Sequence, residues 1–314
     1  MMISRTVFVL ACLATVSAAN PAILRQFNKL INSDVCLKKC MDHLQEHDIE
    51  LSLVKRTNVT DHLLNLELVC EMIGSARTCL DNCQVKSNPF ALRSVNALCN
   101  RETKKIVDEL QPCLTQHGRQ INEECIKECG DYETFHEQVN EASAKLAKQP
   151  YFDAEAHSNF ARMSNDACAM FKCSQRCTVL KTSATCPRLP DGNDAGGAVR
   201  YLIDLTLHTH RADLDGMRLT NIMATQTEPE CNYLYAPEVM FDVQRDRMMV
   251  ASLHAQQKKI NEDIIAGRRP QFTTPSSLHH NHKEEVVVPM DQEADQVEKE
   301  LHNILHTFEH PKHL

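Results

Sequence analysis

The sequence predicts an all-α protein whose helices are held together by disulfide bonds. Only 8 of the 314 residues are glycine, which leaves few positions for the tight turns of an all-β sandwich or for phosphate-binding loops. Long segments are rich in helix-forming residues and have helix breakers mainly at their edges. Of the 15 cysteines, eight form four C-x-x-x-C pairs, and on a helix this spacing puts both sulfurs on one face.

Composition and charge exclude several protein classes. The chain is 42% hydrophobic and 24% charged, as in ordinary globular proteins, so neither a collagen nor a wholly disordered chain is expected. The formal net charge of −8 is unfavourable for binding nucleic acid through its phosphates.

The segment 1–19 has the pattern of a secretory signal peptide. Arg5 is followed by an apolar run over residues 6–16 and then by the small residues Ser17, Ala18 and Ala19. The run is too short for the alternative of a membrane anchor, and no later stretch has eighteen consecutive apolar residues. We therefore expect cleavage after Ala18 or Ala19 and a secreted, extracellular protein with no membrane span.

Fourteen cysteines remain once the signal peptide and its Cys12 are removed, and in an oxidising compartment this even number predicts seven disulfides. The positions are Cys36, Cys40, Cys70, Cys79, Cys83, Cys99, Cys113, Cys125, Cys129, Cys168, Cys173, Cys177, Cys186 and Cys231. Zinc binding is the alternative, but zinc knuckles favour C-x-x-C, which is absent here. Paired cysteines point in parallel, so we expect the six single cysteines to bond members of the pairs, with one pair left to bond another pair. The connectivity itself stays open.

Helical elements are expected along the whole cysteine-rich region, residues 20–266. Apolar residues recur at intervals of three and four between residues 63 and 73, after a Thr60-Asp61 step that offers a helix cap. Further helices are expected over residues 91–117 (with Pro112 inside), 121–148 and 154–182, before a loop rich in Pro, Asp and Gly at residues 187–197. Only residues 198–207 show weak strand-like alternation.

A second helical part is expected to begin at Pro237. Its apolar residues keep a 3.6-residue period at Met240, Val243, Val250, Leu253, Ile260 and Ile264.

Residues 267–314 are expected to form a separate tail. Residues 269–289 contain three prolines and several histidines, as in a solvated linker, and residues 297–308 fit one stripe of a short amphipathic helix. That helix either docks on the body or stays mobile, and we favour mobility because no cysteine ties it down.

Motifs of enzyme chemistry are missing from the sequence. It contains no G-x-S-x-G, H-E-x-x-H, P-loop or G-x-G-x-x-G motif, and disulfide pairing would leave no free thiol as a nucleophile. We therefore expect a non-enzymatic protein that needs no cofactor. His302, His306 and His310 lie at intervals of four and are weak candidates for a metal site, the alternative being an incidentally histidine-rich tail.

One signal predicts a covalent modification. Asn58-Val59-Thr60 is an N-glycosylation sequon, and it is the only one in the chain.

The cysteine pattern also resembles that of a known family. The segments CLKKC, CLDNC, CIKEC and CSQRC, with the signal peptide and helical body, resemble the nematode secreted domain named after chondroitin proteoglycan 4 over roughly residues 30–235. A related nematode family of secreted cysteine-rich helical domains is a similar match. The resemblance implies a non-enzymatic extracellular protein that, in the namesake, carries chondroitin. This chain has no Ser-Gly dipeptide for chondroitin attachment, so we carry over the domain without the glycosaminoglycan.

Two functions follow from these observations. The first is a structural or interaction protein whose partner is an unknown extracellular protein or matrix component. The second is a carrier of a small ligand such as a lipid, held in a cavity between helices. Only 5% of the residues are aromatic, which weakly disfavours a large apolar pocket.

Overall fold

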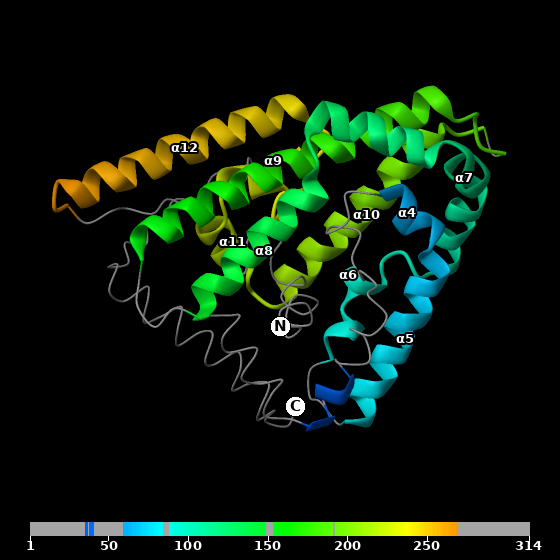
Figure 1. Ribbon diagram of the computed structural model, residues 1–314, viewed down its shortest axis with the longest axis horizontal. Coiled ribbons are helices and arrows are strands. Elements are labelled where there is room, and N and C mark those ends of the chain that lie inside the picture. Colours follow the sequence, from blue (N-terminus) through cyan, green and yellow to red (C-terminus); the bar gives the residue numbers. More distant parts are fainter. Residues whose placement is uncertain are drawn as a thin grey trace, which may run out of the picture. The chain divides into compact units, whose positions relative to one another are not determined.

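The computed structural model describes residues 35–36, 38–40, 59–83, 88–148, 153–190 and 192–268. These residues form α-helices and short 3-10 helices and contain no strand, so the predicted all-α class is confirmed (Figure 1). The chain divides after Val243 into two units, residues 1–243 and 244–314, which we describe separately.

The first unit begins with short helical pieces at residues 35–36 and 38–40, followed by α4 (Val59–Leu64) and α5 (Leu66–Asn82). Thr60 and Asp61 lie inside the first turn of α4 and do not precede it as a cap. The apolar period predicted here is confirmed, because α5 buries the stripe Leu66, Val69, Ile73, Ala76 and Leu80.

A 3-10 turn (Pro89–Ala91) and α6 (Arg93–Asn96) lead into the long helix α7 (Arg101–Cys129). The Asn100 side chain caps α7 by accepting a hydrogen bond from the Thr103 N–H at 3.0 Å. The sequence suggested a break between residues 117 and 121, but α7 continues through Gly118. A Cβ at that position would lie 3.1 Å from Thr60, so the glycine permits close packing of α4. The helix ends instead at Gly130, whose φ of 92° only glycine adopts readily.

Helices α8 (Tyr132–Lys148) and α9 (Ala154–Thr185) follow. The 32-residue α9 is the central element of this unit and packs against α7, α8 and α10 (Figure 1). Its buried side chains include Phe171, whose ring lies 5.5 Å from that of Tyr132 in α8 and 5.2 Å from that of Tyr233. These three buried rings form an aromatic cluster beside α9.

The helix α10 (Ala195–Gly216) starts earlier than the predicted loop 187–197 allows, and it includes residues 198–207, which were doubtful for a strand. Asp194 caps it by accepting a hydrogen bond from Gly197 N–H at 2.7 Å. Position 196, inside the helix, requires glycine because α9 passes too close to leave room for a side chain. A Cβ on Gly196 would collide with the backbone oxygen of Val179.

The first unit ends with α11 (Thr220–Gln226) and two 3-10 helices, η2 (Pro229–Leu234) and η3 (Pro237–Val239). Pro237 starts a helical turn, as predicted, but that turn is η3 and stops before the next helix. Met240, expected in the apolar stripe of that helix, is instead fully buried in the first unit.

The described part of the second unit, residues 244–268, consists mainly of α12 (Val243–Ile265), which is closed by Gly267 at a φ of 66° and whose first residue belongs to the first unit. Val250, Leu253 and Ile260 are partly buried, whereas Ile264 is 49% exposed. None of the helices among the described residues combines the length and apolar character needed to cross a bilayer.

Several predictions concern residues outside the described ranges. They are the signal peptide at residues 1–19, the Asn58 sequon, the linker at 269–289, the amphipathic helix at 297–308 and the histidines at 302, 306 and 310.

Candidate functional site

All fourteen cysteines after Ala19 are joined in seven disulfides, with Cα–Cα distances between 5.0 and 5.9 Å. The predicted number of disulfides is therefore confirmed. The bonds are Cys36–Cys83, Cys40–Cys79, Cys70–Cys99, Cys113–Cys186, Cys125–Cys177, Cys129–Cys173 and Cys168–Cys231.

The expected choice of partners was wrong. Every C-x-x-x-C pair bonds a second C-x-x-x-C pair, and the six single cysteines bond one another. The first cysteine of one pair joins the second cysteine of the other, which is the pattern of two antiparallel helices facing each other. Two parallel sulfur vectors, one turn apart, match an identical set on an antiparallel neighbour. We call each such arrangement a double staple.

The first double staple consists of Cys36–Cys83 and Cys40–Cys79, and it ties the helical pieces at residues 35–36 and 38–40 to the last turn and C-cap of α5. Its sulfurs are crowded, since Cys40 Sγ lies 3.6 Å from Cys83 Sγ of the other bond. The Sγ atoms of Cys36, Cys40 and Cys83 all lie within 4.8 Å of one another. Cys36 is exposed, whereas Cys40 is buried.

The second double staple consists of Cys125–Cys177 and Cys129–Cys173, and it joins the end of α7 to the middle of α9. Cys125 and Cys177 are buried and pack with Ile121 in one apolar cluster. A carboxylate oxygen of Glu128 lies 3.8 Å from Cys177 Sγ.

The three single bonds extend this network to the remaining elements. Cys70–Cys99 links α5 to the turn before α7, Cys113–Cys186 links α7 to the end of α9, and Cys168–Cys231 links α9 to η2. Helix α9 with its C-cap therefore carries four of the seven bonds.

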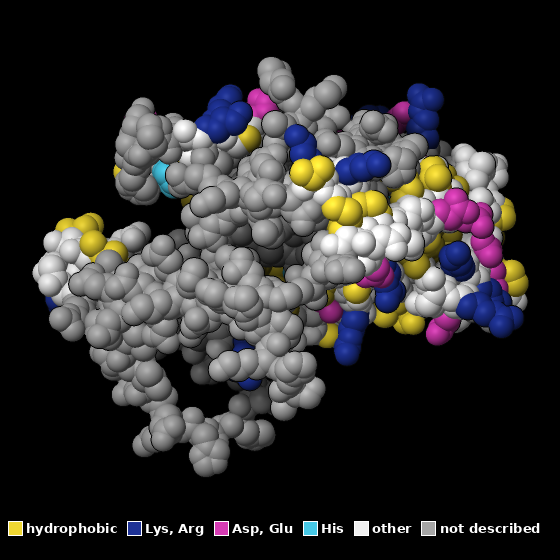
Figure 2. All heavy atoms as spheres, turned by 90° about the horizontal axis from the view of Figure 1, so that it is seen from below, with side chains coloured by type: hydrophobic (Ala, Val, Ile, Leu, Met, Phe, Trp, Pro, Cys, Tyr) yellow, Lys and Arg dark blue, Asp and Glu magenta, His cyan; other side chains and the backbone are white. Residues whose placement is uncertain are grey.

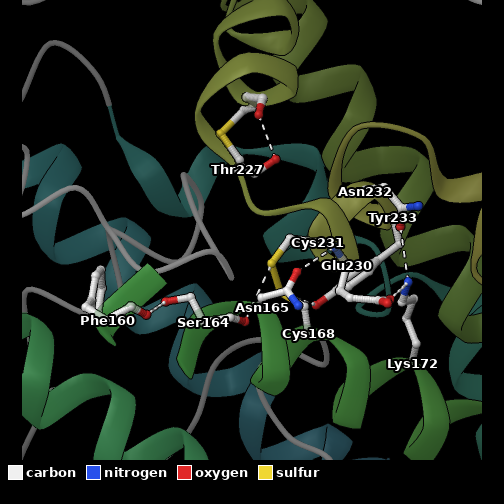
Figure 3. The surroundings of a disulfide bond; sticks show 11 residues. Phe160, Ser164, Asn165, Cys168, Lys172, Thr227, Glu230, Cys231, Asn232 and Tyr233 are labelled. Atoms are coloured by element: carbon white, nitrogen blue, oxygen red, sulfur yellow. Dashed lines mark hydrogen bonds and ion pairs between the residues drawn. A yellow bond between two sulfur atoms is a disulfide. The ribbon is translucent and has the colours of Figure 1, made fainter. Parts of the chain in front are cut away.

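A buried polar cluster surrounds the Cys168–Cys231 bond (Figure 3). The Lys172 ammonium forms an ion pair with Glu230 at 2.5 Å and lies 3.4 Å from the side-chain oxygen of Asn232. The Lys172 side chain is only 2% exposed, whereas that of Glu230 is 26% exposed. Nearer the start of α9, the Asn165 side chain accepts a hydrogen bond from the Glu230 backbone N–H at 3.0 Å.

Further along α9, another polar side chain contacts the same segment of the chain. Arg176 donates hydrogen bonds to the backbone oxygens of Val239, at 3.0 Å, and Met240, at 2.5 Å. Together, Asn165, Lys172 and Arg176 fix residues 229–240 against α9 in one register. Burying the Lys172 charge costs solvation free energy that the ion pair offsets, so the cluster specifies where the segment docks more than it adds stability.

No sequence signal marked this cluster. Lys172 follows Phe171 on a helix whose other charged residues are mostly exposed, and Glu230 lies far along the chain in a Pro- and Cys-containing turn. A lysine in a helix is nearly always a surface residue, so only the fold identifies this one as buried.

The buried histidine of α10, unlike Lys172, is held without charge. Burial lowers the pKa of His210 from 6.5 to about 4, against a smaller opposing effect of the Asp213 carboxylate. Asp213 itself accepts hydrogen bonds from Ser94, from the backbone N–H at 2.8 Å and from the hydroxyl at 2.7 Å. This carboxylate therefore attaches the start of α6 to α10.

A small pocket between α5, α6 and α10 bears on the carrier hypothesis. Its lining includes Leu66, Ile73, Leu98 and Thr206, and its volume is about 10 Å³. This is room for about one water molecule and is far too small for a lipid chain. A larger hollow beside Gly74, Ser75 and Cys79 on α5 lies open to solvent and does not enclose a ligand.

No family model, curated protein or solved structure matches this chain.

Proposed function

We propose that this chain is a secreted, non-enzymatic structural or interaction protein of the extracellular space. The observation that carries the proposal is that all fourteen cysteines after Ala19 are used in seven disulfides. Such bonds form and persist in oxidising compartments and are rare in the cytosol. The signal-peptide pattern of segment 1–19 supports the same compartment.

The disulfide network suits a protein that presents a fixed surface. Bonds to α9 and its C-cap hold α7 and η2 in place, and the buried polar cluster fixes residues 229–240. A rigid surface binds a partner without the entropy cost of ordering mobile segments.

The surface itself is mixed in charge. On the face shown in Figure 2, Lys and Arg side chains lie among Asp and Glu side chains. Pairs such as Arg119–Glu123, at 2.9 Å, and Lys181–Glu124, at 2.8 Å, illustrate this arrangement. Such a surface favours a protein or matrix partner over a polyanion held by uniform positive charge. We propose further that the chain carries a domain of the chondroitin proteoglycan 4 type without a chondroitin chain.

The test is the intact mass of the full chain expressed in secretory cells. We expect the protein in the medium, cleaved after Ala18 or Ala19, and with a gain of fourteen hydrogens on full reduction. Enzymatic removal of N-glycans should lower the mass if Asn58 is modified.

The matched control lacks the segment 2–19. It should remain inside the cell with its thiols reduced. A full chain retained in the cytosol, or a secreted chain with free thiols, would overturn the proposal.

A further inference from the structure

We propose that the first double staple is also a redox-dependent metal site, in which reduction lets Cys36, Cys40, Cys79 and Cys83 bind one divalent ion of the Zn²⁺ type. The proposal starts from sulfur atoms that the fold brings together from different disulfides. Cys40 Sγ and Cys83 Sγ are not bonded to each other, yet they lie 3.6 Å apart. The Cys36 sulfur is bonded to Cys83 and lies within 4.8 Å of Cys40 Sγ. Cys79 Sγ, in contrast, is not within 4.8 Å of all three of these sulfurs.

The distance between Cys40 Sγ and Cys83 Sγ is close to the distance between neighbouring sulfurs of a tetrahedral four-sulfur site. A Zn–S distance of about 2.3 Å places neighbouring sulfurs about 3.8 Å apart. The Cys40–Cys83 separation already fits this spacing. Once the two S–S bonds are broken, rotation about χ1 can move the formerly bonded sulfurs apart without moving the helices. Each helix then supplies two thiolates from one face, and a four-sulfur tetrahedral set favours Zn²⁺ among common divalent ions.

The surroundings of the site favour reduction. Cys36 is an exposed residue, so its disulfide is open to attack by a dithiol. The charged residues that flank the site in the sequence have both signs, since Lys38 and Lys39 lie within the first C-x-x-x-C segment and Asp81 lies within the second.

Opening the first double staple consumes two dithiol molecules. They reduce the two disulfides to four cysteine thiols and are themselves oxidised to disulfides. Binding of the metal ion then releases the four thiol protons.

The second double staple provides an internal contrast. It has the same spacing and the same pairing, but Cys125 and Cys177 are 1% and 3% exposed. The Glu128 carboxylate beside Cys177 disfavours a neighbouring thiolate. We therefore expect this staple to resist reduction under conditions that open the first one.

The experiment uses Co²⁺ as the probe, because four thiolates around tetrahedral Co²⁺ give intense visible absorption. The full secreted protein is treated anaerobically with a limiting dithiol, and alkylation with peptide mass mapping identifies the opened bonds. We expect the first double staple to open first, with uptake of one Co²⁺ per chain that Zn²⁺ displaces. The C36S/C83S variant should bind Co²⁺ more than about 100-fold more weakly, since loss of even an outer-sphere partner costs about 10–100-fold.

The matched control is C129S/C173S, which removes the corresponding bond of the second double staple and should bind Co²⁺ like the unmodified chain. Far-UV circular dichroism checks that each variant keeps its helices. If C36S/C83S loses its helices, C36S alone serves instead and should lose the four-thiolate spectrum. The proposal is overturned if the four reduced cysteines take up no Co²⁺, if the ligand variants bind it like the unmodified chain, or if C129S/C173S abolishes binding.

Discussion

The two double staples share a cysteine spacing, a pairing pattern and a loop size, yet they lie in different environments. The first encloses 47 and 39 residues and the second 52 and 44, so closing the outer loop restricts the unfolded chain by about 4 kcal/mol in each case. The first is partly exposed at the end of α5, whereas the second packs against Ile121 beneath α9. Because the entropic contributions match, any difference in stability between variants of the two staples measures burial and packing.

The two double staples have different roles in the fold. Near α9, disulfides, the aromatic cluster and the Lys172 ion pair all fix the same helix. At the end of α5, the disulfides hold a segment in which Cys40 is the one buried residue among those that the structure describes. We therefore expect the α9-centred part to determine global stability and the α5 end to open locally.

The largest expected effect comes from removing a whole double staple. Changing the four cysteines of the second staple to alanine should cost about 8 kcal/mol, because two loop closures contribute about 4 and 2–3 kcal/mol and lost packing beside Ile121 adds about 2 kcal/mol. The same change in the first staple should cost about 2 kcal/mol less, because fewer buried contacts are lost. Urea unfolding of the two variants, followed by circular dichroism, measures both values.

Hydrogen exchange identifies the helices that each double staple holds. Loss of the first staple should raise exchange mainly in the last turns of α5, whereas loss of the second should raise it in α7 and α9 together. Equal costs and uniform exchange in both variants would contradict the division into a central and a peripheral part.

The Lys172 ion pair should show the next largest effect. Lys172→Met leaves Glu230 and Asn232 without their buried cation. We expect a cost of about 3 kcal/mol, at the lower end for buried pairs because Glu230 is partly hydrated. Chemical denaturation provides the measurement.

The matched control is Lys181→Met on the same helix. Its ion pair with Glu124 is accessible to solvent, and water screens such a pair so strongly that its loss should change the stability very little. A second variant, with both Lys172 and Glu230 changed to methionine, should regain most of the lost stability. A cost for Lys172→Met no larger than that of the control would show that the cluster does not hold residues 229–240.

The contrast between the two staples also shows what the sequence could predict. Helical periodicity and even cysteine number were enough for the all-α class and the seven disulfides, because both are local or arithmetic properties. The pairing of one C-x-x-x-C segment with another was missed, because it depends on two helices lying antiparallel at a matching height. No local pattern in the sequence between Cys125 and Cys173 predicts how far along each other the two helices lie.

The roles of Gly196 and Lys172 were not predicted from the sequence, for a related reason. Gly196 looked like part of a loop, although its role is to let α9 approach α10, and a close approach leaves no periodic pattern. The burial of Lys172 likewise depends on Glu230, a partner from a distant part of the sequence. Sequence periodicity thus identified which segments are helical, whereas long-range packing decided which of their polar residues matter.

Acidification should weaken the central part through His210. Because burial lowers the pKa of His210 to about 4, the unfolded chain binds more protons than the folded one between pH 6.5 and pH 4. The free energy of unfolding should therefore fall by about 3 kcal/mol as the pH is lowered through that window, and it should be fully restored above pH 6.5. Denaturation at about pH 7.5, 5.5 and 4 spans this window and measures the loss.

The variant His210→Leu isolates the contribution of the histidine. Carboxylates that titrate in the same range affect both proteins, so the difference between their pH profiles reports His210. Parallel profiles would mean that the imidazole is protonated or hydrated in the folded protein.

The smallest expected effect tests the close helix contact with a pair of alanine substitutions. Gly196→Ala would drive a methyl group into the Val179 backbone oxygen, so α9 and α10 must move apart at a cost of about 2 kcal/mol. Gly74→Ala in α5 meets no atom within 4 Å and should stabilise the protein by about 0.5–1 kcal/mol, because alanine favours the helix. Thermal unfolding of both variants should give shifts of opposite sign. Two stabilising substitutions would mean that α9 and α10 can separate freely, and the central part would then be no more tightly packed than the α5 end.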